Sequence, residues 1–376
     1  MNIRTLQTAA VCLLGVTILG FWGIGFRPRV TTGVNDFVQL YAGAKLVGTP
    51  QLYDVEASQK IQMEAVGRFI DAVYYTRLPF YALVLKPLGA LPYLTAYYIY
   101  QCVSLVVVGL FLWRFAKLVP ETAILACMSP PLLVNFANGQ DVGLTAAAAG
   151  FAYLLRLRNR PLLAGLVLSL GAIKFHLLIL VPLVLLVRRE WKMLQGGAVG
   201  AVALFGLSVI ADGIGWPVRY LSAVSNPALH PAAGHMPTLR NLVWAICGED
   251  NLSLEIALSA AVAAALAFSC LRSRSLSASL GFGLIGSLLV CHHAYTHDLT
   301  MLIPATALLI HGEAPKPARA LAFLCSLPPV AFFIITGQPL STVLVVAMFA
   351  TVLSGMGLRA QERPATGDTE TIPVGA

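Results

Sequence analysis

Charged residues are scarce in this chain. Only 11% of its 376 residues are Asp, Glu, Lys or Arg and 58% are hydrophobic, so the mean hydropathy is +0.78. A soluble domain carries about 25% charged residues. The scarcity excludes an ordinary soluble domain and indicates a protein that crosses a membrane several times.

Motifs for nucleotide and metal chemistry are also missing. The sequence contains no Walker A loop for a nucleotide and no DxD pair for a metal–nucleotide complex. Its seven cysteines lie mostly within apolar runs, and no two of them have the CxxC spacing. We interpret them as small hydrophobic residues, which argues against a disulfide framework or a zinc site.

Apolar runs make up most of the chain and predict its fold class. Because a helical span needs about 20 apolar residues and shorter helices can lie inside a bundle, we expect an all-α polytopic bundle of about 10–13 spans. Residues 1–358 would form one membrane domain with a first outer loop at 27–93, followed by a disordered cytoplasmic tail at 359–376. The candidate spans are residues 7–26, 94–113, 121–137, 142–155, 161–173, 175–188, 193–211, 252–271, 276–293, 299–311, 318–336 and 339–357.

The net charge of +8 comes from basic residues that cluster in short loops. With the N-terminus placed in the cytoplasm and the spans alternating, 15 of the 25 Lys and Arg residues fall on the cytoplasmic side. Seven of the other ten lie in the single long segment 27–86. This bias follows the positive-inside rule, so the charge is explained without a nucleic acid partner.

The same topology gathers the unusual polar stretches on the outer side of the membrane. Ionisable residues at membrane depth are costly and usually functional. We therefore expect a site at the outer face. The stretches are 31–80, "NFANGQD" at 135–141, "IKFH" at 173–176, 212–250 and "CHHAYTHD" at 291–298.

Asp36 opens a segment in which Phe37, Tyr41, Ala44 and Val47 recur at helical spacing. This spacing predicts an amphipathic helix that lies on the membrane surface. Asp36 either caps that helix, as Asp often does, or acts as a general base above the lipid headgroups. The residues alone leave both interpretations open.

Lys174 and His176 interrupt the apolar stretch "LLAGLVLSLGAIKFHLLILVPLVLL". The Lys174 ammonium either snorkels to the interface or binds a phosphate group, and its place on the outer side favours the phosphate. In that case Lys174→Ala is expected to weaken donor binding while the protein stays folded. The loop "HPAAGHMPTLRNLVWAICG" offers further donors to the same anion, namely His230, His235, Arg240 and Asn241.

The densest polar cluster is "CHHAYTHDLTML". His293 and His297 are four residues apart and would share one face of a helix, a spacing that can bind zinc with help from Asp298. Since no third ligand and no general-base Glu accompany them, contacts with a phosphate group are preferred and no metal is expected. Gln140 and Asp141 end another apolar run, where they either close a hairpin turn or belong to the site.

Five segments in this order resemble motifs of glycosyltransferase family 87. "NDFVQLYAGAKLVGTPQLYD" is similar to the first-loop motif of that family, and "LPFYALVLKPLGALP" resembles its Tyr–Pro–Pro segment with Leu78 and Pro79 in place of the double proline. "NGQDVGL" is similar to its Gly–Gln motif, "GAIKFHLLILVPLVLLVRREW" to its span with a Lys followed by a Pro, and "HHAYTHDLTML" to its late His/Tyr/Asp segment. The resemblance runs over about residues 31–300.

The resemblance implies a GT-C fold, a bundle of membrane helices whose long first outer loop carries a catalytic Asp. It also implies transfer of mannose from polyprenyl-phosphate mannose to a glycolipid, with inversion and without metal or cofactor. Asp36 would be the base. The implied donor contacts are Lys174, His176, Gln140, Arg240, His293 and His297, and the further candidates are Tyr41, Asp298, His235 and Asn241.

A lipid-linked donor also suits the expected site on physical grounds. Outside the cytoplasm there are no nucleotide sugars, so an activated sugar must arrive on a lipid carrier. A carboxylate has to take the acceptor proton, and cations have to stabilise the departing phosphate. We expect an enzyme of the inner membrane with its site facing the periplasm, and a polyprenyl-phosphate sugar, a glycolipid or glycan acceptor and membrane lipids as its partners.

Three other classes stay open from the residues. A transporter or flippase for an anionic lipid would use the same cations, but it would place polar residues on both faces and show an inverted repeat. A structural subunit of an envelope assembly would need no Lys inside a span. A glycan ligase or a pentosyltransferase has the same spacing as a mannosyltransferase, and the oligomeric state is left open as well.

Overall fold

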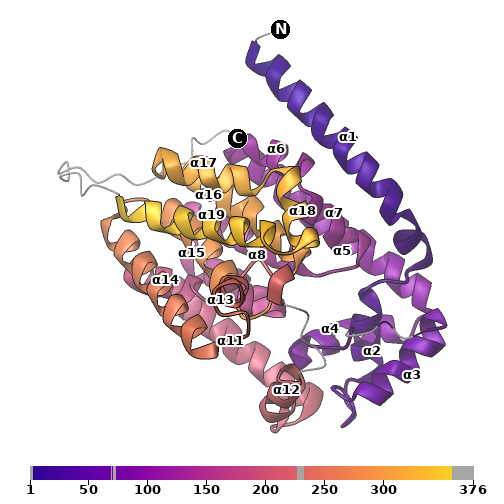
Figure 1. Cartoon of the computed structure of the whole chain (residues 1–376). Helices are drawn as coiled ribbons and strands as arrows, with labels where there is room; N and C mark the ends of the chain where they lie inside the picture. Colours follow the sequence, from indigo (N-terminus) through magenta and orange to yellow (C-terminus); the bar gives the residue numbers. More distant parts are fainter. Residues whose placement is uncertain (1–2, 69, 71–72, 227–232, 358–376) are drawn as a thin grey trace.

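The computed structural model describes residues 3–68, 70, 73–226 and 233–357. Every regular element within these residues is a helix, which confirms the expected all-α class. The 30-residue helix α1 (Ile3–Thr32) contains the first expected span and extends beyond the rest of the bundle at its N-terminal end (Figure 1). His230 and the expected tail at 359–376 lie outside the described residues.

The first loop folds into three short helices that lie together next to the start of α5 (Tyr93–Leu118; Figure 1). The first of them is buried on all sides, and only Lys45 is exposed. The amphipathic surface helix expected after Asp36 is therefore not what the structure has, because the neighbouring helices cover every face of this segment. One-sided burial occurs instead in the second helix, where Ser58 and Gln62 on one face are buried and Lys60 and Glu64 on the other are exposed. The three are α2 (Phe37–Leu46), α3 (Val55–Val66) and α4 (Pro79–Gly89).

Fewer helices than expected are long enough to be complete spans. Within the part of the chain that the structure describes, four qualify by length and composition, and the pair α17 (Lys316–Cys325) and α18 (Pro328–Thr336), bent by 63°, would make a fifth. Prolines explain part of the difference, because a proline inside a helix removes a hydrogen bond and breaks the helix. The expected span 121–137, for example, is split before Pro130. The four long helices are α5 (Tyr93–Leu118), α9 with η1 (Pro161–Ser169 and Leu170–Leu178), α11 (Trp191–Asp212) and α14 (Leu252–Arg272).

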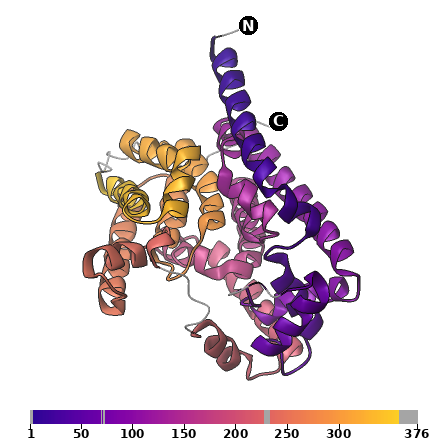
Figure 2. The ribbon, with the colours of Figure 1, turned by 45° about the vertical axis from the view of Figure 1, so that its right-hand side comes forward.

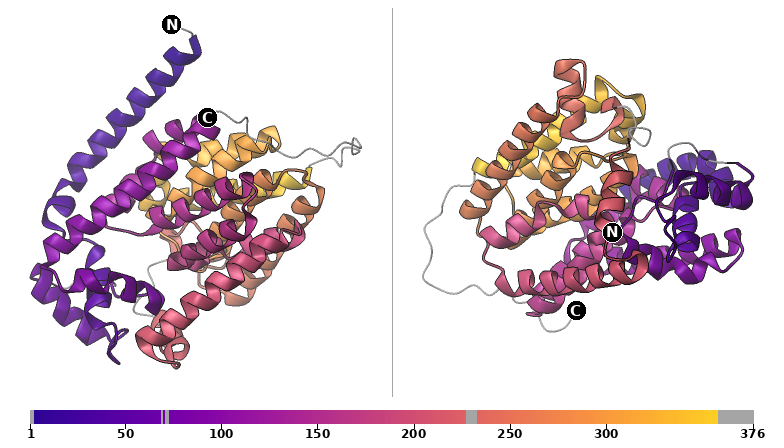
Figure 3. Two further views of the ribbon diagram at one scale, coloured as in Figure 1. Left: turned by 180° about the vertical axis from the view of Figure 1, so that it is seen from behind. Right: turned by 90° about the horizontal axis from the view of Figure 1, so that it is seen from below.

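The remaining helices fill the bundle between these spans. The N-terminal helices lie on one side of the protein and the orange to yellow C-terminal helices lie on the other (Figures 2 and 3). The helices are α6 (Glu121–Cys127), α7 (Pro130–Ala137), α8 (Val142–Leu157), α10 (Val181–Val187), α12 (Trp216–Val224), η3 (Ala233–His235), α13 (Leu239–Cys247), α15 (Leu276–Val290), η4 (Thr296–Met301), α16 (Leu302–His311), α19 (Leu340–Ser354) and η5 (Gly355–Gly357).

Two irregular segments meet at the centre of the bundle. Helix α15 is buried along nearly its whole length, and η1 and η4 both pack against α15 and α8. These two 3₁₀ segments interrupt the regular helices at that depth. Non-helical backbone is tolerated inside a membrane protein only where it is buried in protein or lines a cavity, and here it provides the place for polar side chains.

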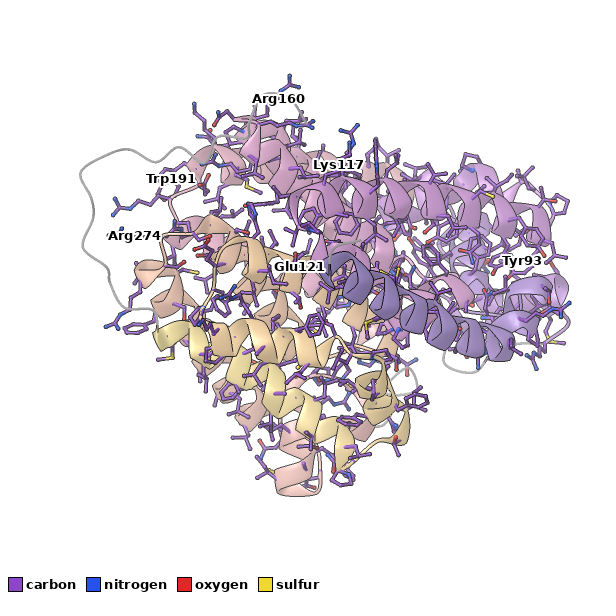
Figure 4. The ribbon with its side chains drawn as sticks, turned by 90° about the horizontal axis from the view of Figure 1, so that it is seen from above. Tyr93, Lys117, Glu121, Arg160, Trp191 and Arg274 are labelled. Atoms are coloured by element: carbon purple, nitrogen blue, oxygen red, sulfur yellow. The ribbon has the colours of Figure 1, made fainter. Side chains whose placement is uncertain are left out.

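Three of the basic loops that were expected in the cytoplasm, at 156–160, 188–192 and 272–274, share one region of the surface (Figure 4). Viewed from above, Arg160, Trp191 and Arg274 lie toward one side of the protein, and Tyr93 at the start of α5 lies toward the opposite side (Figure 4). The first loop ends at Tyr93. The basic loops and the first loop are therefore separated, while their orientation in a membrane stays a prediction.

Candidate active site

A cavity of about 440 Å³ opens where the first loop, the turn before α8, the segments η1 and η4, and α12 come together. Each of the five polar stretches contributes at least one residue to its wall, so their expected convergence is confirmed. The lining residues are Asp36, Gln39, Val73, Tyr74, Thr76, Arg77, Gln140, Lys174, Phe175, His176, Tyr220, Val224, His292, His293, Tyr295, His297 and Asp298.

The Asp36 carboxylate faces this cavity and does not cap α2. Its Oδ2 accepts a hydrogen bond from Gln140 Nε2 at 2.7 Å, and its side chain makes no capping bond. The start of α2 is held instead by Asn35, whose Oδ1 accepts from the Phe37 amide at 3.0 Å. The capping interpretation of Asp36 is therefore wrong, and within the described residues its only side-chain hydrogen bond is the one from Gln140.

Burial controls the acidity of Asp36. Loss of solvent raises the pKa of this carboxyl above its usual value, and the hydrogen bond from Gln140 opposes part of that rise. A raised pKa makes a carboxylate a stronger base, as general-base catalysis near neutral pH requires.

Gly139 brings Gln140 against the start of α2. It adopts a φ of +62°, and a Cβ at this position would lie 2.7 Å from the Phe37 Cβ. Only glycine combines that conformation with so close an approach. Asn35 ties the two segments together, because its Nδ2 donates to the Ala137 carbonyl at 3.2 Å. The "NGQ" sequence is thus a tight turn that delivers the amide of Gln140 to Asp36.

Arg77 fixes the orientation of that amide. Its Nη2 donates to Gln140 Oε1 at 3.3 Å, so the oxygen of the amide faces the guanidinium and the nitrogen faces Asp36. The opposite orientation would set oxygen against carboxylate and N–H against guanidinium. Arg77 also binds Asp141 through two bonds, Nε to Oδ2 at 2.7 Å and Nη2 to Oδ1 at 3.1 Å. A paired arginine therefore holds the partner of the candidate base.

Lys174 is buried in an ion-pair network and does not snorkel. It is 3% exposed, its Nζ lies 2.7 Å from Asp298 Oδ1 and 3.7 Å from Asp141 Oδ1, and the backbone kinks at Lys174 within η1. Arg77, Asp141, Lys174 and Asp298 thus alternate in charge, and the four together are neutral. Asp141 closes no hairpin turn with its side chain, which makes no capping bond.

The two histidines expected on one helix face lie on different backbone. Helix α15 ends at Val290 and η4 begins at Thr296, so His293 and His297 do not share a helix. Tyr295 lies between them: its ring stacks on His297 at 5.5 Å and its hydroxyl lies 3.1 Å from His293 Nε2. Among the described residues, no three His, Cys, Asp or Glu side chains are grouped to hold a metal ion.

Four of the sequence candidates lie outside the cavity wall and have partners of their own. Arg240 binds Asp250 through two bonds of 2.9 and 2.6 Å. The polar groups of all four candidates bind partners near α13 or in the first loop, so the structure does not bring them to Asp36. The other contacts are Asn241 to Ser341 Oγ, His235 Nδ1 to the Ile334 carbonyl, and Tyr41 Oη to the Leu91 carbonyl.

The sequence of this chain matches the model of one known protein family. The family model described as glycosyltransferase family 87 matches residues 75–293. The chain belongs to this family. It is therefore a membrane glycosyltransferase, an enzyme that transfers a sugar from a donor to an acceptor. Searches of curated proteins and of solved structures gave no match.

The family 87 match and the cavity overlap only in part. Arg77, Gln140 and Lys174 lie within the matched residues, whereas Asp36 and Asp298 lie outside them. The hydrogen bonds described above connect both carboxylates to the matched part of the chain.

Arg77 and Gln39 line the cavity of this family 87 enzyme and were not among the candidates predicted from its sequence. Arg77 stands just before the apolar helix α4 in "TRLPF". An arginine at the edge of an apolar run could have indicated a functional residue. Gln39 lies within "NDFVQLY", where a glutamine in a helical pattern carries no distinguishing signal.

Proposed function

We propose that this family 87 glycosyltransferase moves a hexose, with mannose as the first candidate, from a polyprenyl-phosphate donor to a hydroxyl group of a glycolipid or glycan. Transfer takes place at the outer face of the cytoplasmic membrane, inverts the anomeric centre and needs no metal. The observation that carries the proposal is the Asp36 carboxylate, which lines the cavity and has Gln140 as its single hydrogen-bond partner among the described residues.

A single displacement suits this arrangement of groups. The acceptor hydroxyl loses its proton to Asp36 as its oxygen attacks the anomeric carbon, and the bond from that carbon to the donor phosphate oxygen breaks. Attack from the face opposite the phosphate inverts the centre. Gln140 holds the carboxylate in one position, which general-base catalysis requires.

The cavity wall suits an amphipathic donor. One part carries charged and polar groups, and the other carries Val73, Phe175, Tyr220 and Val224. Because Arg77 and Lys174 are already paired with carboxylates, the histidines of the wall supply the remaining donors for the phosphate of the ligand. The wall histidines without a hydrogen bond to a described residue are His176 and His297.

Helix α12 continues the apolar surface away from the cavity. Tyr220 and Val224 line the cavity, while Val218 is 75% exposed and Leu221 is 63% exposed. An apolar helix face beside a membrane span can lie against lipid chains. This surface supports a donor that is attached to a lipid.

The orientation of the protein is tested by cysteine labelling in intact cells. Once the exposed native Cys102 and Cys247 are replaced by Ala, Gln51→Cys is expected to react with a membrane-impermeant maleimide. Arg158→Cys is expected to react only after permeabilisation, because basic loops stay in the cytoplasm. Labelling of Arg158→Cys in intact cells would contradict an outward-facing site.

The activity is tested with purified protein in detergent. Polyprenyl-phosphate mannose and a glycolipid acceptor are expected to give a mannosylated product at the same rate with and without EDTA, and a nucleotide-linked mannose is expected to give none. Transfer from the nucleotide sugar would refute the lipid donor. Loss of activity in EDTA that a divalent ion restores would assign His293, His297 and Asp298 to a metal site.

A further inference from the structure

Gln39 lies one helical turn after Asp36 and lines the same cavity. Residues three apart on a helix are neighbours, with Cβ atoms about 5–6 Å from each other. The amide of Gln39 and the carboxylate of Asp36 therefore face the cavity from the same side of α2.

The Gln39 amide is nearly buried but has no partner among the described residues. Gln39 is 7% exposed, and no hydrogen bond joins its side chain to any described residue. Gln62, also in the first loop, shows the usual arrangement: its Nε2 donates to the Val73 carbonyl and its Oε1 accepts from the Ile70 amide. Buried polar groups are almost always hydrogen-bonded, so the Gln39 amide calls for an external partner.

The amide is open to the cavity. Among the described residues, the sealed side-chain atoms without a partner include those of Gln101 and Asn135 but none of Gln39. Whatever fills the cavity can therefore reach both the N–H donors and the carbonyl acceptor of Gln39.

The charges around the cavity indicate the chemistry of that partner. The two strong cations of the wall are bound to Asp141 and Asp298, while Gln39, His176 and His297 have no hydrogen bond to a described residue. An amide both donates and accepts, which matches a sugar hydroxyl. A phosphate oxygen accepts but does not donate, and would leave the amide carbonyl unsatisfied.

We propose that Gln39 binds sugar hydroxyl groups in the cavity, next to the hydroxyl that meets Asp36. The proposal rests on the proposed function, since it places the reacting centre at Asp36. The hydroxyls belong either to the sugar of the donor or to a sugar of the acceptor, and binding measurements separate these two sources.

The test compares Gln39→Leu with the wild type. Since the Gln39 side chain makes no hydrogen bond to any residue that the structure describes, the variant is expected to unfold at the wild-type temperature. Its Kd for polyprenyl-phosphate mannose is expected to rise about 10-fold, the effect of one lost hydrogen bond in a buried site. Its Kd for polyprenyl phosphate without sugar should stay unchanged. Gln51→Leu, at an exposed turn of the same loop, serves as the matched control.

Each outcome decides the proposal. A rise confined to the mannosyl lipid assigns Gln39 to the donor sugar, and an unchanged donor Kd with a raised KM for the acceptor assigns it to the acceptor sugar. An equal loss with the bare phosphate, or no change in either constant, overturns the proposal. If Gln39→Leu fails to fold, the isosteric Gln39→Glu replaces it in the same measurements.

The readout also separates this proposal from the proposed function. Polyprenyl phosphates carrying mannose, glucose or arabinose are tested for thermal stabilisation of the wild type, beyond that of the bare lipid. Sugar-dependent stabilisation that Gln39→Leu removes supports the role of Gln39 even if no transfer is seen. If no donor sugar gives such stabilisation and Gln39→Leu also leaves the KM for the acceptor unchanged, the sugar subsite is overturned.

Discussion

Asp36→Asn is expected to lower the rate of sugar transfer by about 10²–10⁴-fold, the usual contribution of a general base. The Asn side chain keeps the size of Asp, and its Oδ1 can still accept from Gln140 Nε2. Because the Asp36 side chain makes no capping bond, the substitution removes basicity and little else. Turnover, donor Kd and thermal unfolding, measured on the same preparation, should show a folded protein that binds its donor and does not transfer.

The pH profile distinguishes a base from a structural carboxylate. The pKa of Asp36 is raised by burial, so activity should fall with acid at a higher pH than an ordinary Asp with a pKa of about 3.9 would give. The Gln140 bond stabilises the charged form, and Gln140→Leu should therefore move this acidic limb to still higher pH. If Asp36→Asn turns over within a few-fold of the wild type, the base lies elsewhere, and Asp298 is the next residue to test.

The sequence predicted the gathering of polar groups because burying them is costly. Only 11% of the residues are charged, and Asp36, Gln140 and Lys174 stand next to apolar runs. Because such side chains are costly to expose to lipid, a shared interior site was the expected location for all three. The structure puts all three on one cavity. Composition and spacing were sufficient for this part of the site.

The hydrogen-bond and ion-pair partners of the site residues could not be predicted from the sequence, because they depend on how distant segments of the chain pack together. Gln140 and Asp36 are 104 residues apart, and they meet only because Gly139 lets a turn touch α2. Arg240 has the positive charge that a phosphate ligand requires and lies in the expected outer stretch 212–250. In the structure, however, its guanidinium is paired with Asp250 of the same stretch.

Helix lengths were overestimated for a local reason. Hydropathy does not register that proline lacks a backbone N–H. Apolar runs that contain Pro130 or Pro328 were therefore predicted as single spans, although the helix breaks before each proline. The same holds for Lys174, where the kink that positions the ammonium has no signature in the apolar pattern around it.

Lys174→Met is expected to destabilise the protein by about 3–5 kcal/mol, the cost of leaving a buried charge without its partner. Asp298 would lose the ammonium 2.7 Å away, while Asp141 would keep Arg77. The structure thereby corrects the expectation that Lys174→Ala leaves the fold intact. Thermal unfolding in detergent measures the loss, and Lys86→Met, at an exposed site on α4, is the matched control.

Removing the charge of Asp298 as well should restore most of that stability. In Lys174→Met with Asp298→Asn, the Asn oxygen can still accept from the Tyr295 amide, which donates to Asp298 Oδ2 at 2.8 Å. No unpaired charge is then left, and neutral replacements of a buried ion pair are often tolerated. Recovery of the unfolding temperature without recovery of transfer would show that the pair serves the reaction as well as the fold. A Lys174→Met protein of full stability that binds polyprenyl phosphate poorly would contradict the ion-pair account and make Lys174 a phosphate ligand.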